Sequence, residues 1–109
     1  MTDFTEERRS APRRAMVLDA EVVDIPLGAK FNARSADFSR TGCYIDTLNP
    51  ISEGTEVRLR VTHHAENFVA SARIVYVSPG MGMGLTFTNV EDQQMACLDR
   101  WLSEPLKEY

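Results

Sequence analysis

Long apolar runs and closely spaced cysteines are both missing from this sequence. No apolar run approaches the roughly 20 residues that a membrane-spanning helix needs, so we expect no insertion into a membrane. Residues 1–7 are acidic, whereas a secretory signal begins with basic residues and continues with an apolar stretch. The only cysteines are Cys43 and Cys97, which lack the spacing of a metal knuckle or a redox pair. These absences favour a cytoplasmic protein with two buried free thiols.

Motifs for catalysis, for a dinucleotide cofactor and for a metal are missing as well. The glycine-rich stretch 80–84 precedes a predicted strand and does not join a strand to a helix, which excludes the dinucleotide-binding fingerprint. Neighbouring side chains such as His63 and His64 diverge on a strand, and no cysteine or carboxylate at a suitable spacing completes a ligand set, so we predict no metal site. No nucleophile-elbow sequence surrounds Ser39. We therefore expect a protein that is not an enzyme and has no cofactor.

What the sequence does contain is enough apolar residues for one small domain. The 109 residues are 43% hydrophobic and 26% charged, which fits a single globular core and not two domains. Alternation of apolar and polar residues, typical of half-buried strands, recurs six times along the chain. The six predicted strands cover residues 16–23, 31–39, 43–46, 56–61, 68–77 and 82–87.

The last part of the chain predicts a helix over about residues 90–103. Asn89 stands at its predicted start, and Asp92 follows three residues later in the position of a capping-box acid. Pro105 ends the helix. The predicted fold class is therefore mainly β, a six-stranded antiparallel β-barrel with a C-terminal α-helix and an extended N-terminal arm. Residues 1–14 are expected to form the flexible arm, and residues 15–104 the single barrel domain.

Positive charge is concentrated in the predicted arm. Four of the twelve basic residues lie in residues 8–14 (RRSAPRR), while residues 15–109 contain eight basic and thirteen acidic side chains. A long polyanion would be repelled by the acidic body once it left this tract, so the charge distribution favours a compact anion as ligand. A solvated, disordered tail is the alternative.

Arg9 and Arg13 have the spacing of a clamp. On an extended arm they point the same way, with Cα atoms about 13 Å apart at roughly 3.3 Å per residue. Each guanidinium is a planar fork that can bind a phosphate, or the O6/N7 edge of guanine, through two hydrogen bonds. The tract contains no lysine, which favours recognition by geometry over bulk attraction.

Asp37 and Ser39 are two residues apart on a predicted strand and so project to the same face, just before a turn that Gly42 allows to close. A carboxylate beside a hydroxyl and free backbone N–H groups can accept from the ring N–H and the exocyclic amine of guanine. The alternative is that the three residues only cap the turn.

The order Arg9-x-x-x-Arg13, followed by Asp37-x-Ser39-x-x-Gly42, resembles the PilZ domain family, and the resemblance covers nearly the whole chain. It implies a bacterial receptor for cyclic di-GMP in which the two motifs bind the nucleotide together. By this resemblance, Arg9 and Arg13 contact phosphate and guanine. Asp37, Ser39 and Gly42 hold a guanine against the barrel.

The same resemblance brings in further residues. Residues 82–87 look like the closing strand of the family. A basic residue at the position of Arg8 is associated in the family with two stacked nucleotides instead of one. Related domains can offer a side chain of the fifth strand for stacking on a guanine, here Arg73 or Tyr76; because their spacing is odd, only one of them should face the site. Arg14 has no support from the motif.

The resemblance also implies an unidentified downstream protein that recognises the nucleotide-bound state. The main alternative is a PilZ-like interaction module that binds a pilus, flagellar or polysaccharide-synthesis component without a nucleotide. A barrel that binds single-stranded nucleic acid does not fit, because the body is acidic and no strand set interleaves aromatic with basic residues.

Overall fold

The computed structural model describes residues 12–105. The described elements are strands and one helix, and every strand pairing is antiparallel. In chain order they are β1 (Arg14–Ala15), β2 (Asp19–Asp24), β3 (Ala29–Phe38), β4 (Gly42–Asp46), β5 (Glu56–His63), β6 (Glu66–Ser78), β7 (Gly82–Asn89) and α2 (Asp92–Ser103).

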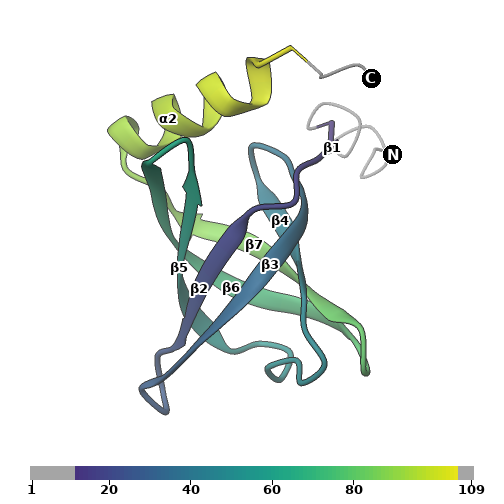
Figure 1. The fold of residues 1–109 in the computed structure, drawn as a ribbon. Helices are drawn as coiled ribbons and strands as arrows, with labels where there is room; N and C mark the ends of the chain where they lie inside the picture. Colours follow the sequence, from purple (N-terminus) through teal and green to yellow (C-terminus); the bar gives the residue numbers. More distant parts are fainter. Residues whose placement is uncertain (1–11, 106–109) are drawn as a thin grey trace, which may run out of the picture.

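Six of these strands close into a barrel (Figure 1). Their hydrogen-bonded order is β3-β2-β5-β6-β7-β4, and β4 pairs with β3 again, so the ring has no open edge. Strand β1 is an outer strand added to β3. The helix α2 lies across one end of the barrel, and β1 lies near the same end. These findings confirm the fold class that the alternation predicted, a six-stranded antiparallel barrel with a C-terminal helix.

The core follows from the alternation of side chains. In β5, Val57, Leu59 and Val61 are fully buried, whereas the arginines between them are exposed. Leu98 and Trp101 of α2 are also buried and belong to the same core cluster. Full burial of a side chain of this size stabilises the fold by about 1.5–3 kcal/mol. The helix therefore covers apolar residues that the barrel would otherwise expose at this end.

The helix begins later than the sequence predicts. Asn89 is the last residue of β7, and the helix starts at Asp92 with Glu91 as its N-cap, which makes no side-chain cap hydrogen bond. The predicted capping box is wrong because the ladder between β6 and β7 continues to Asn89, which pairs with Ser71. The helix ends at Ser103, as the sequence predicts.

A buried serine fixes the segment between β1 and β2 to the barrel. The hydroxyl of Ser35 donates to the carbonyl of Met16 at 2.6 Å and accepts from the amide of Leu18 at 3.0 Å. Because Ser35 is fully buried, losing these bonds would leave its hydroxyl unsatisfied. The chain is thus bound to β3 from Arg14 onward. The division into an arm of residues 1–14 and a domain of residues 15–104 stays a prediction, since residues 1–11 lie outside the described ones.

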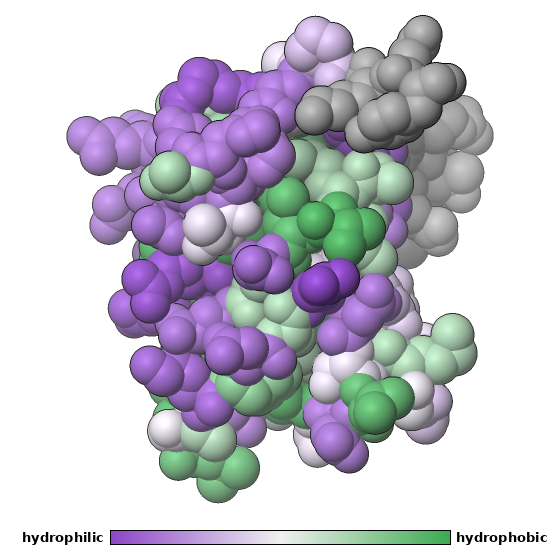
Figure 2. Space-filling view, viewed as in Figure 1, coloured by the Kyte–Doolittle hydropathy of each residue, from purple (hydrophilic) through white to green (hydrophobic). Residues whose placement is uncertain are grey.

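The outer surface of the barrel is mainly polar. Figure 2 shows hydrophilic side chains over most of the visible face, with smaller apolar areas between them. Within residues 12–105, no helix has both the length and the apolar character required to cross a membrane.

Candidate functional site

The predicted site residues of the barrel lie where β3, β4, β7 and β6 run side by side, with Asp37, Arg73 and Tyr76 on its outer surface. Asp37 on β3 pairs with Tyr44 on β4. Tyr44 pairs with Gly84 on β7, which in turn pairs with Tyr76 on β6. At about 4.8 Å per strand, this row is about 14 Å long. Register shifts interrupt the β3–β4 and β6–β7 ladders beside it. We therefore use the name bulged face for this row of Asp37, Tyr44, Gly84 and Tyr76 together with the turn of residues 39–42.

Asp37 forms an ion pair with Arg13, the described arginine of the predicted clamp. Nε and Nη2 of Arg13 lie 3.1 and 2.9 Å from Oδ1 of Asp37. Both side chains are partly exposed, at 48% and 31%. Exposed ion pairs contribute only about 0–1 kcal/mol to folding stability, so a ligand can take the place of this pair without unfolding the chain. Arg8 and Arg9, the other predicted arginine ligands, lie outside the described residues.

Ser39 is placed differently from Asp37, because it is fully buried. Its hydroxyl accepts a hydrogen bond from the amide of Thr41 at 3.1 Å and lies 3.1 Å from the Thr41 hydroxyl. Its own amide donates to the carbonyl of Gly42 at 2.9 Å. Ser39 therefore shapes the turn, as the capping alternative holds, and a direct contact between its hydroxyl and a ligand stays a prediction.

Gly42 stands where β4 and β7 approach too closely for a side chain. A Cβ at this position would overlap the main-chain carbonyl oxygen of Leu85 on β7. In the same turn, the carbonyl of Thr41 accepts a hydrogen bond from the amide of Phe87 at 2.8 Å. Close approach of two backbones is a common reason for glycine in a strand. Gly42 thus allows the turn to be fixed to β7 directly beside Asp37.

Two tyrosine rings cover the glycines of β7. The ring centroids of Tyr44 and Tyr76 are 6.0 Å apart. A Cβ on Gly84 would overlap the ring of Tyr76, and a Cβ on Gly82 would lie 2.6 Å from the ring of Tyr44. The glycines therefore let both rings lie against the backbone, and Tyr76 remains 47% exposed. The search for site residues in the sequence missed Tyr44, although alternation after Gly42 gives it an outward position.

Arg73 and Tyr76 are both exposed, although their odd spacing would place them on opposite faces of a regular strand; that only one of them faces the ligand site stays a prediction. The ladder between β6 and β7 shifts register between Ile74 and Tyr76. Ile74 is fully buried, whereas Val75 and Tyr76 are exposed in succession. A bulge thus breaks the alternation on which the prediction depended. Arg73 donates from Nε to Glu56 at 2.7 Å; whether Arg73 or Tyr76 stacks on a ligand stays a prediction.

Two arginines connect α2 to the bulged face and to the arm. Arg40 in the turn donates to Asp99 of α2 at 2.8 Å, and this hydrogen bond lowers the pKa of Asp99. Arg14 donates from Nη1 to the carbonyl of Leu102 at 2.7 Å, which satisfies a free carbonyl at the C-terminal end of the helix. Sequence reasoning assigned neither contact, because no local pattern indicates partners 59 and 88 residues away.

A thiol lies directly beneath the bulged face. Cys43 is fully buried on β4; burial raises the pKa of its thiol, and the nearby Asp37 carboxylate raises it further. The thiol is therefore neutral and unreactive at ordinary pH. Cys43 and Cys97 are both free and buried, which confirms the prediction made from their spacing.

Fold and site together are those of a small binding module, in which Arg13 meets the carboxylate of Asp37 beside two tyrosine rings on the outside of a closed barrel. The chain belongs to the PilZ domain family, whose model matches residues 7–104. This range includes the predicted ligands Arg8 and Arg9, as well as the bulged face and α2.

Three solved structures have a similar fold. The PilZ domain of CeSA from a cellulose synthesizing bacterium is 22% identical, with a TM-score of 0.66, over 83% of this chain and 93% of that one. The PilZ domain of YcgR from Escherichia coli, solved with c-di-GMP, is 18% identical, with a TM-score of 0.70, over 86% and 88%. The Bacillus subtilis inhibitor of motility, MotI/DgrA, is 18% identical, with a TM-score of 0.68, over 89% of this chain but 53% of that one. No match to a curated protein sequence was found.

Proposed function

We propose that this protein is a cytoplasmic receptor for cyclic di-GMP that passes the signal to a partner protein and has no catalytic activity. Membership of the PilZ family supports a receptor of this kind. One similar structure, the PilZ domain of YcgR, was solved with c-di-GMP. The proposal for this chain depends on its own residues on the bulged face.

The ion pair between Arg13 and Asp37 is the observation that carries the proposal. It brings together two motifs that are 24 residues apart in sequence, so a forked donor and a carboxylate acceptor already meet at one place. Guanine offers N–H groups to a carboxylate and its O6/N7 edge to an arginine. Cyclic di-GMP can therefore give each side chain a new partner of the same chemical kind as the present one.

Arg9 and Arg8 complete the clamp from the arm. Arg9, about 13 Å from Arg13 on an extended chain, can reach the phosphate or the second guanine of the same ligand. Arg8 would support a second, stacked nucleotide. Ordering the backbone costs about 1–2 kcal/mol per residue, and hydrogen bonds to charged groups contribute about 1.5–3 kcal/mol each. Binding therefore requires several of these contacts at once.

Strand β6 offers a second point of contact. The exposed ring of Tyr76, or the guanidinium of Arg73, can stack on a guanine, an interaction worth about 1–3 kcal/mol per base. Gly84 contributes by leaving room for the tyrosine ring. A ligand that reaches from Asp37 to Tyr76 would cover most of the bulged face.

The output follows from the connections between the bulged face and α2. A nucleotide that draws Arg13 away from Asp37 moves the residue next to Arg14. Arg14 in turn is bound to the end of α2. Contacts between arm and helix then differ between the free and bound states. A partner protein can distinguish the two states by the surface formed from arm, nucleotide and barrel.

Calorimetric titration with cyclic di-GMP tests this proposal. We expect one or two nucleotides per chain, and binding at least tenfold weaker in Arg9→Ala and Asp37→Asn. Arg34→Ala and Asp19→Asn are matched controls, because these residues form another exposed pair, 3.9 Å apart, that also involves β3; their affinity should equal that of the native chain.

Two outcomes would overturn the proposal. Absence of binding by the native chain would favour the nucleotide-independent module that binds a pilus, flagellar or polysaccharide-synthesis component. Equal binding by all five proteins would show that the nucleotide binds away from Arg9 and Asp37.

A further inference from the structure

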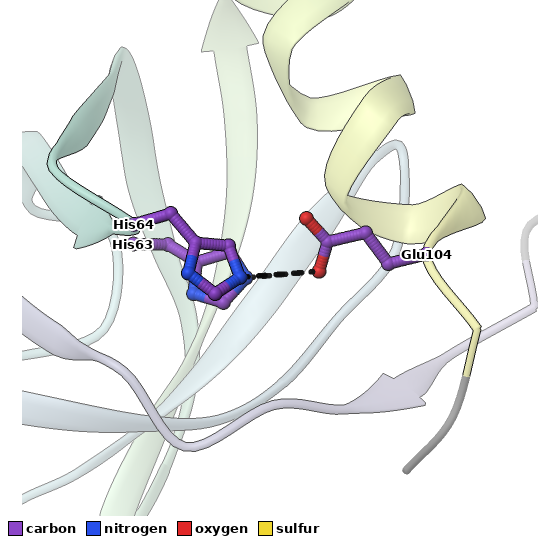
Figure 3. A group of neighbouring side chains, drawn as sticks. All are labelled: His63, His64 and Glu104. Atoms are coloured by element: carbon purple, nitrogen blue, oxygen red, sulfur yellow. Dashed lines mark hydrogen bonds and ion pairs between the residues drawn. The ribbon is translucent and has the colours of Figure 1, made fainter.

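The hairpin between β5 and β6 brings three metal-ligating side chains together, away from the bulged face. Nε2 of His63 and Nε2 of His64 lie 3.0 and 3.9 Å from the same carboxylate oxygen, Oε1 of Glu104. The ligand atoms of all three residues lie within 4.8 Å of one another. Figure 3 shows the two imidazole rings one behind the other, with Glu104 reaching toward them from the end of α2.

This geometry corrects the sequence argument that neighbouring histidines diverge. His63 ends β5, but His64 and Ala65 form a two-residue turn with φ values of 54° and 64°. Positive φ at both turn residues reverses the chain tightly, so the alternation of a strand does not extend to His64. The two imidazole centroids are consequently only 3.9 Å apart. Glu104 follows His63 by 41 residues, and no ligand spacing in the sequence indicates it.

We propose that His63, His64 and Glu104 bind a divalent transition-metal ion, with Zn²⁺ as the best match. Imidazole nitrogen and carboxylate oxygen are common zinc ligands, with bonds of about 2.0–2.2 Å. A tetrahedral ion with such bonds separates its ligand atoms by about 3.3 Å. The distances of 3.0 and 3.9 Å to Glu104 lie on either side of this value. Small side-chain movements are therefore enough to form the site, and a fourth position stays open for water.

Packing holds one ligand in place and leaves the other accessible. The His63 ring meets the edge of Trp101, with centroids 5.1 Å apart and planes at 84°, and its side chain is 16% exposed. His64 is 65% exposed, so an ion can enter from solvent and the His64 ring can adjust to it. Such an arrangement combines a fixed ligand with a movable one.

The local charge also suits a cation. Glu104 supplies an acidic side chain to the cluster, and its Oε1 already lies 3.0 Å from Nε2 of His63. A glutamate side chain is ordinarily ionised at neutral pH, so it attracts a cation. The Glu66 carboxylate accepts hydrogen bonds from Trp101 and from Arg100, at 3.0 and 2.6 Å, so its charge is largely balanced by Arg100. Arg14 is the opposing positive charge, and its guanidinium is bound to the helix end instead of to Glu104.

A bound ion would join the β5–β6 turn to the C-terminal end of α2. Because Glu104 joins the two histidines only in the folded chain, the ion would bind the folded chain more tightly than the unfolded one and would raise the melting temperature. This site shares no ligand with the proposed nucleotide site, so either proposal can fail without the other.

Titration of tag-free, chelator-treated protein with ZnCl₂ tests the site. The chain contains only two histidines, and both belong to the cluster, so the imidazole NMR signals report on this site alone. We expect one Zn²⁺ per chain, shifts of both imidazoles and a higher melting temperature. MgCl₂ should have no such effect, since Mg²⁺ selects oxygen ligands.

Variants at the surface identify the ligands without disturbing the core. His64→Asn keeps a residue type that tolerates positive φ, and Glu104→Gln keeps the side-chain size. Each should weaken Zn²⁺ binding at least tenfold. Glu91→Gln, at the other end of α2, is the matched control and should bind as the native chain does. Absence of saturable binding at one ion per chain, unmoved imidazole signals, or native affinity in either ligand variant would overturn the proposal.

Discussion

The two sides of the barrel differ in how regularly their strands pair. Strand β2 pairs with β5 over Asp19–Asp24 without a register shift, and its outward Glu21 is bound to Arg60 at 2.9 Å and lies 3.6 Å from Lys30. The bulged face has register shifts in two ladders and glycines beneath its tyrosine rings. Bulges re-aim side chains and concentrate near functional sites. The regular side is a continuous ladder whose outward charges are paired with one another, and the bulged face presents groups that can exchange partners.

The largest expected effect concerns the glycines of the two sides. Gly42→Ala should lower the free energy of unfolding by about 3 kcal/mol, because its Cβ meets the Leu85 carbonyl in a backbone that cannot move freely. Gly28→Ala, in the β2–β3 turn, meets no atom within 4 Å but has a φ of +70°, so it should lose only about 1–2 kcal/mol. Urea unfolding measures both. A smaller loss at Gly42 than at Gly28 would contradict the close approach of β4 to β7.

The second-largest expected effect concerns the affinity for cyclic di-GMP, which should depend on the ion pair of the bulged face and not on that of the regular side. Arg13→Ala should weaken cyclic di-GMP binding by about 2 kcal/mol, or roughly 30-fold, since it removes a charged donor from the ligand. Arg60→Ala removes an arginine that is similarly exposed but bound to Glu21, and the affinity should not change. Calorimetry of both variants measures the difference. Equal loss in the two would mean that bulk charge, and not the Arg13 fork, attracts the nucleotide.

The sequence predicted the regular side well and the bulged face only in part. Alternation is a reliable signal where every residue pairs in turn, as in Val57, Leu59 and Val61. It fails at a bulge, which is why Arg73 and Tyr76 are both exposed despite their odd spacing.

Contacts between segments far apart in the sequence were not predicted either. The motifs named Asp37 and Gly42 as candidates, but the partners of Arg40 and Arg14 on α2 depend on how the helix crosses the barrel end. The contact between His63 and Glu104 also depends on how the helix crosses the barrel end, and their separation of 41 residues in the sequence does not indicate it.

The smallest effect is a pH dependence that both sides should share. A hydrogen bond from Arg40 lowers the pKa of Asp99 below its ordinary value of 3.8. A hydrogen bond from Arg60 likewise lowers the pKa of Glu21 below its ordinary value of 4.5. A carboxyl whose pKa is lowered by folding stabilises the protein above its ordinary pKa, and this stabilisation is lost as the pH falls through the lowered value. Melting temperatures of Asp99→Asn and Glu21→Gln should therefore lie slightly below the native value near about pH 6 and reach it near about pH 2. A difference that grew on acidification would contradict the direction of both pKa shifts.

The central claim is that the nucleotide binds between the arm and the bulged face, and amide NMR of the native chain titrated with cyclic di-GMP tests it most directly. The account predicts that the largest shifts fall in residues 8–14, in residues 37–44 and around Tyr76, while β2 and β5 change little. Shifts confined to β2 and β5, or bound-state signals from residues 8–14 identical to the free ones, would contradict it.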